Sequence, residues 1–85
     1  MYKIMLDIRS MEDAKTFVNI VRRYEFNVDV LSQQYVVDAK SILGVLSLDL
    51  SQPVEAFARS NDCGDLMKEL EVFVHPGEHM VYVED

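Results

Sequence analysis

Two stretches of the chain repeat apolar residues at helical spacing, and in each the apolar residues fall along one side only. The first covers residues 11–24 and includes Phe17 and Val21, and the second covers residues 63–73 and includes Leu66. A helix with a single apolar side has to bury that side against another layer of structure. The rest of the chain therefore has to supply a sheet that both helices can cover.

Four short stretches fit that requirement, because apolar and polar residues alternate along them with the period of a β-strand. They cover residues 2–8, 27–32, 35–38 and 54–59. A brief helix is expected at residues 42–46, where Gly44 argues against a longer one. The resulting order, β-α-β-β-α-β-α, predicts an α+β, two-layer open-faced sandwich with helices on one face of the sheet and solvent on the other.

The length of the chain, 85 residues, is that of one domain, which we place at residues 1–77. The Pro-Gly pair at positions 76–77 ends the second long helix, since proline removes a backbone donor and clashes with the preceding turn. Residues 78–85 form a C-terminal extension. Two states fit this extension: an edge strand built on the weak alternation at residues 81–83, or a disordered tail.

The composition argues against several classes of function. Apolar residues make up 49% of the chain and charged residues 27%, as in a soluble globular domain. Acidic residues outnumber basic residues 15 to 8, and the net charge of -7 disfavours nucleic acid and anionic membranes as partners. No apolar run reaches the roughly 20 residues of a membrane-spanning helix, and residues 1–4 lack the features of a signal peptide. Since Cys63 is also the single cysteine, we expect a cytoplasmic protein.

Residue types suited to catalysis or metal binding are sparse. His75 and His79 are four residues apart, but the proline and glycine between them interrupt the helix that would place both on one metal ion. Cys63 lies on the apolar side of its helix, which favours a buried and inert thiol. We find no glycine-rich phosphate loop and no paired nucleophile and base. The sequence therefore predicts no enzyme, no metal and no cofactor.

Residues 40–48, which read Lys-Ser-Ile-Leu-Gly-Val-Leu-Ser-Leu, are the most informative stretch. They resemble the regulatory-serine signature of HPr, the phosphocarrier of the bacterial sugar phosphotransferase system. Residues 23–28, Arg-Tyr-Glu-Phe-Asn-Val, also resemble the segment between the first helix and the second strand of that family. The resemblance covers roughly residues 2–75, and it implies an antiparallel four-stranded sheet covered by three helices.

The resemblance fails where the family carries its phosphoryl group. Counting back without gaps from the signature serine places the relay motif Gly-Ile-His-Ala-Arg-Pro-Ala on residues 8–14, which read Ile-Arg-Ser-Met-Glu-Asp-Ala. Ser10 stands in the place of the phosphorylated histidine, and Glu12 in that of the arginine. A hydroxyl without a base is a poor nucleophile compared with an imidazole, and acidic groups repel phosphate. We therefore expect Ser10 to cap the first helix; His75 and His79 do not match the relay position, although spacing alone leaves them open as donors.

Ser41 and three apolar neighbours are the other candidates. Ser41 is a helix cap in one interpretation and, through the resemblance, a regulatory phosphorylation site in the other. Ile42, Leu43 and Leu46 either cover the sheet or form the apolar docking surface that the family uses for partner proteins. The expected function is that of a non-catalytic adaptor or regulator that binds a phosphotransferase-system enzyme, a kinase or a transcription regulator through the Ser41–Leu46 surface.

Other functions stay open at this point. The chain could be an active phosphocarrier or a phosphoserine-responsive corepressor of carbohydrate uptake. It could also be a scaffold that assembles through residues 81–83 as an edge strand, so both a monomer and a weak homodimer fit the sequence.

Overall fold

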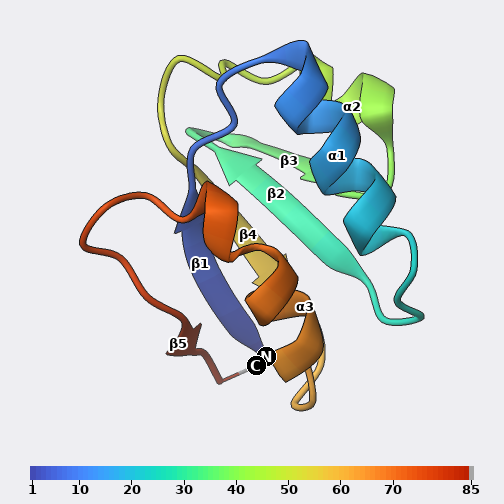
Figure 1. Cartoon of the computed structure of the whole chain (residues 1–85), viewed down its shortest axis with the longest axis vertical. Coiled ribbons are helices and arrows are strands. Elements are labelled where there is room, and N and C mark those ends of the chain that lie inside the picture. Colours follow the sequence, from blue (N-terminus) through green and yellow to red (C-terminus); the bar gives the residue numbers. More distant parts are fainter. Residues whose placement is uncertain (85) are drawn as a thin grey trace.

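The computed structural model describes residues 1–84, and it confirms the predicted two-layer α+β sandwich. The strands are β1 (Tyr2–Leu6), β2 (Val28–Ser32), β3 (Tyr35–Asp38), β4 (Val54–Ala58) and β5 (Val81–Tyr82). The helices are α1 (Met11–Val21), α2 (Ile42–Leu46) and α3 (Gly64–Glu69), followed by a 3-10 turn at Glu71–Phe73. The three helices lie on the same side of the sheet (Figure 1).

The sheet has five strands in the order β3-β2-β4-β1-β5, and every neighbouring pair is antiparallel. This corrects the expected count of four, because the C-terminal extension forms the edge strand that was one of its two predicted states. Tyr2 lies opposite Tyr82 and Lys3 opposite Val81 in this added pairing. The two tyrosine rings meet edge to face, with centroids 5.2 Å apart.

The outer edge of β1 is paired in two separate places. One is the pairing with β5, and the other is at the opposite end, where Leu6 bridges to Val74 and Met5 O accepts a hydrogen bond from His75 N at 2.9 Å. Between these two places the chain swings away from β1 in a wide loop (Figure 1). We call this loop, residues 76–80, the strap. Its Gly77 has a φ of 86°, which glycine adopts without strain.

The core lies between the sheet and the helices. Alternate residues of β1, β2 and β4 turn their side chains toward the helices and are buried, as the period of two predicts. Phe17 of α1 is fully buried, and its ring meets that of Phe73 edge to face at a centroid distance of 6.4 Å. The other sheet face carries ion pairs, such as Lys3 Nζ to Glu55 Oε2 at 3.6 Å.

Both long helices end earlier than the apolar spacing predicts. α1 stops at Val21, and Tyr24 N instead donates to Val21 O at 3.1 Å in a tighter turn. α3 stops at Glu69, and the 3-10 turn then keeps Phe73 on the buried side. A 3-10 turn brings every third residue to one side, so it preserves the apolar spacing without continuing the helix.

Candidate functional site

Ser10 is the N-cap of α1. Its Oγ accepts a hydrogen bond from Asp13 N at 3.0 Å, and the Asp13 carboxylate accepts in return from Arg9 N at 3.1 Å. Glu12 and Asp13 lie in the first turn, where carboxylates suit the positive end of the helix dipole. The Ser10 hydroxyl is therefore engaged in holding the first turn of the helix.

His75 lies next to this corner of the molecule. Its Nδ1 is 2.9 and 3.0 Å from the two carboxylate oxygens of Asp7, although 68 residues separate the pair in sequence. Backbone hydrogen bonds fix the approach, since Asp7 N donates to Phe73 O at 2.7 Å and His75 N donates to Met5 O. The structure thus places one of the two histidines that spacing left open beside the connection from β1 to α1.

Two basic side chains, Arg9 and His75, contact the Asp7 carboxylate. Arg9 Nη2 donates to its Oδ2 at 2.9 Å, on the same group that His75 contacts. Burial raises the pKa of Asp7, but the hydrogen bonds and charges of His75 and Arg9 together outweigh burial and hold the pKa below its ordinary value of 3.8. Because an ionised carboxylate can only accept, it assigns the proton to Nδ1 and leaves Nε2 as the lone-pair nitrogen of the neutral ring.

A hollow of about 230 Å³ opens beside this pair. Asp7, Arg9 and His75 line one part of it, and residues 50–53 of the loop before β4 line the rest. An imidazole oriented by a carboxylate, with a guanidinium close by, can take up a proton or a phosphoryl group. Sequence reasoning did not assemble this site, because a histidine that follows the last helix gives no signal about which carboxylate it meets.

Ser41 is the N-cap of α2. Its Oγ accepts from Gly44 N at 3.1 Å, and at the other end of the helix Ser47 Oγ donates to Gly44 O at 2.6 Å. A Cβ at position 44 would lie 3.3 Å from Val37 Cβ, so the glycine lets the helix approach β3 closely. Phosphorylation of Ser41 would load charge onto the oxygen that accepts this cap bond.

The three aliphatic residues of the predicted docking surface differ in exposure. Leu43 is 80% exposed, whereas Ile42 and Leu46 are half-buried against the core. Val45, on the inner side of the same short helix, is fully buried. Helix α2 therefore has one side that belongs to the core and one side that presents a large apolar group to solvent.

Positive charge gathers where α1 meets α2. Lys15 and Arg22 line a hollow of about 260 Å³ together with Ile42. Arg22 Nε donates to Lys40 O at 2.9 Å, and Lys40 Nζ donates to Tyr24 O at 2.6 Å, which ties the end of α1 to the start of α2. Three of the eight basic residues of this acidic chain thus surround the junction between the two helices.

The remaining candidates do not come together. Cys63 is buried, and burial raises the pKa of its thiol, which makes the reactive thiolate scarcer. His79 is exposed on the strap, while His75 is turned to Asp7. Within residues 1–84, no group of three or more His, Cys, Asp or Glu side chains is arranged to hold a metal ion. Over the same residues, no helix has the length and apolar character that crossing a membrane requires.

Comparison with known proteins supports the fold. No protein-family model matches the chain, and no curated protein matches it. Among solved structures, the chain is similar to the crystal structure of HPr-C-His from Thermoanaerobacter tengcongensis, with a TM-score of 0.71 and 27% sequence identity. The match covers 82% of this chain and 86% of that chain. The protein therefore has an HPr-like fold, with the fifth strand as its difference from the four strands that the resemblance implied.

Proposed function

We propose that this protein is a non-enzymatic adaptor or regulator related to the sugar phosphotransferase system, and that it binds a protein partner through the Ser41–Leu46 surface. The observation that carries the proposal is Leu43, which is 80% exposed on α2. The HPr-like fold and the resemblance of residues 40–48 to the regulatory-serine stretch of HPr support the connection with that system.

The surroundings of Leu43 favour a particular kind of partner. An exposed leucine between half-buried aliphatics offers apolar area that docking removes from water. Lys15, Arg22 and Lys40 add local positive charge to a chain whose net charge is -7. A partner with an apolar contact rimmed by acidic side chains would be attracted to this region and repelled by the acidic remainder of the surface.

Two observations argue against phosphate relay at the start of α1. The hydroxyl of Ser10 accepts the cap hydrogen bond, and a serine phosphate ester is too stable to pass its phosphoryl group on readily. Glu12 and Asp13 also place negative charge in the first turn, which repels an incoming phosphate. The proposed role therefore depends on docking and not on group transfer through Ser10.

Titration of the isotope-labelled protein with purified phosphotransferase-system enzymes, the HPr kinase and the transcription regulator of the same cell tests this proposal. For whichever of these proteins binds, Leu43→Asp should raise the dissociation constant by roughly tenfold or more, as expected for loss of a central apolar contact. Val72→Asp is the matched control, since Val72 is 82% exposed but lies on the 3-10 turn. Equal affinities of the two variants would contradict docking through α2.

A second candidate function is that of a phosphocarrier, favoured by the contact of His75 with Asp7. In this reaction Nε2 would form a bond to phosphorus, and the phosphorylated donor protein would keep the electron pair of the bond that breaks. Asp7 would retain the hydrogen bond to Nδ1–H, and Arg9 would offer positive charge in the hollow that the three residues share.

Transfer of labelled phosphate from the donor proteins of the phosphotransferase system distinguishes the two functions. A phosphocarrier should acquire acid-labile label that His75→Gln removes and His79→Gln, the control on the exposed strap, leaves in place. Absence of any acid-labile label in the parent protein would rule out this second function. It would leave the adaptor function intact.

A further inference from the structure

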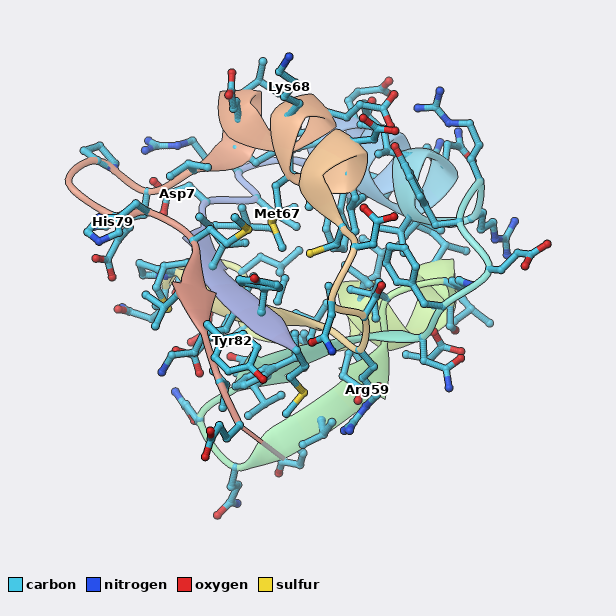
Figure 2. The ribbon with its side chains drawn as sticks, turned by 90° about the horizontal axis from the view of Figure 1, so that it is seen from below. Asp7, Arg59, Met67, Lys68, His79 and Tyr82 are labelled. Carbon is cyan, nitrogen blue, oxygen red and sulfur yellow. The ribbon has the colours of Figure 1, made fainter. Side chains whose placement is uncertain are left out.

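A hollow of about 410 Å³ lies beneath the strap. Neither the Ser41–Leu46 surface nor the contact of Asp7 with His75 contributes to its lining. Its apolar lining comes from Ile4 of β1, Met67 of α3, Val74 and Met80. In Figure 2, Met67 extends from α3 toward β1, on the side of the helix that faces the sheet. The volume falls in the range of about 300–1,000 Å³ that small-molecule sites occupy.

The pairing of β1 explains why the hollow exists. The outer edge of β1 is covered near Tyr2 by β5 and near Leu6 by Val74, and the strap arches away between these two anchors. Ile4 lies between them, and together with Glu78 and His79 of the strap it also lines a second hollow of about 190 Å³. Both hollows therefore border the part of the β1 edge that lies between its two pairings.

Gly64 lines the hollow from the side of α3. It is the first residue of that helix, and a Cβ built there would meet nothing within 4 Å. The thioethers of Met67 and Met80 are flexible and polarizable, so they adapt to irregular gaps, and they make favourable contacts with aromatic rings. The walls thus suit a flat or narrow apolar group more than a branched one.

The charges at the rim favour a cation. Glu71 and Glu78 line the hollow, and within residues 1–84 neither has a basic partner within the range of an ion pair. Lys68 and His79 are the basic residues of the lining, and Figure 2 shows the Lys68 side chain pointing away from the sheet. Glu78 also lines the second hollow, where Lys3 is already paired with Glu55.

We propose that the hollow beneath the strap binds a small primary amine with an aromatic or unbranched alkyl group. The apolar group lies among Ile4, Met67 and Met80, and the ammonium group lies toward Glu78. The net charge of -7 attracts such cations to the whole molecule, and the two rim carboxylates retain them at this place. This site is independent of the docking surface on α2.

Methionine-methyl NMR tests the proposal with 2-phenylethylamine as the probe. The methyl signals of Met67 and Met80 should shift saturably as the amine is added, and that of Met11, exposed at the start of α1, should stay in place. 3-Phenylpropionate, which has a similar apolar group and the opposite charge, should bind at least several-fold more weakly. Equal binding of the amine and the carboxylate, or no saturable shift with the amine, would overturn the proposal.

Two variants locate the binding. Gly64→Leu should abolish the shifts, because position 64 lines the hollow and a Cβ there would meet nothing within 4 Å, which leaves room for a leucine to fill part of the space. Glu78→Gln should raise the dissociation constant about two- to fivefold, the size expected for an exposed charge pair. Glu25→Gln removes the same charge at an exposed position outside the lining and should change nothing. Unaltered amine binding by a folded Gly64→Leu protein, or equal effects of the two glutamine variants, would place the amine elsewhere.

Discussion

The corner at the start of α1 and the outer side of α2 use their side chains in opposite ways. At the corner, Asp7, Arg9 and His75 contact one another, and the contact joins the end of the last helical segment to β1. On α2, Leu43 extends into solvent although the rest of the helix is anchored in the core. The corner therefore contributes to holding the chain together, whereas Leu43 contributes little to that and is better placed to meet another molecule.

The sharpest test of this comparison lies within α2 itself. Val45→Ala should lower the free energy of unfolding by about 2 kcal/mol, because it removes two buried methyl groups and leaves a cavity. Leu43→Ala should change it by less than about 0.5 kcal/mol. Urea denaturation of the two variants measures both values. A large loss of stability with Leu43→Ala would mean that Leu43 is part of the fold and not of a free surface.

The two capping serines provide the next test. Ser10→Ala and Ser41→Ala should each lower the free energy of unfolding by about 1 kcal/mol, since each removes the acceptor for a first-turn N–H group. Substitution by glycine should cost less at each site. If Ser41→Ala has no effect on stability while phosphorylation is found at that position, regulation would become the better explanation for that hydroxyl.

The charged contacts at the corner predict a dependence of stability on acid. The folded pKa of Asp7 is lowered, so its contribution to stability is fully present above its unfolded value of 3.8 and is lost as the pH falls through the folded pKa. His75→Gln should reduce the loss measured between neutral pH and pH 3 by urea denaturation. His79→Gln should leave the acid dependence as it is in the parent protein, because His79 is exposed on the strap.

The smallest predicted effect is a change in the ionisation of Tyr24, which lies just after α1. The carbonyl of this residue accepts a hydrogen bond from Lys40. A hydrogen bond from the Tyr24 hydroxyl to Glu69 Oε2, at 2.5 Å, is the main cause that raises the pKa of Tyr24 to about 12. Its stabilising contribution is present below pH 10 and is lost as the pH rises through 12. Glu69→Gln should bring this late ionisation toward 10 in an absorbance titration, and Glu71→Gln, which changes a charge outside the contact, should not.

The local parts of the fold could be predicted because their signals are local. The strand period places Ile4 and Leu6 under the helices, and the hydroxyl before an apolar repeat marks the start of α1 at Ser10. The predicted end of the first helix was wrong, because Tyr24 keeps the apolar spacing although the backbone has already left the helix at that point. Helix ends depend on backbone hydrogen bonds, which apolar spacing does not reveal.

The candidate sites could be predicted only in part. The resemblance pointed to residues 41–46, but a helix as short as α2 has no periodicity from which to tell Leu43 from its buried neighbour Val45. The contact of Asp7 with His75 depends on the tail returning along β1, so no local pattern announces it. The hollow beneath the strap was missed for the same reason, because its walls are assembled from three separate parts of the chain.

The two separate pairings along the outer edge of β1 also have a consequence for aggregation. Unpaired strand edges allow a second molecule to add a strand, and long apolar edges are the most hazardous. While Val74 and β5 occupy the two ends of β1, a foreign strand would find no continuous run of free backbone there. Release of the tail would uncover all five residues of β1 at once. The contact between Asp7 and His75 holds the start of the tail beside β1, and it thereby helps to keep this strand edge covered.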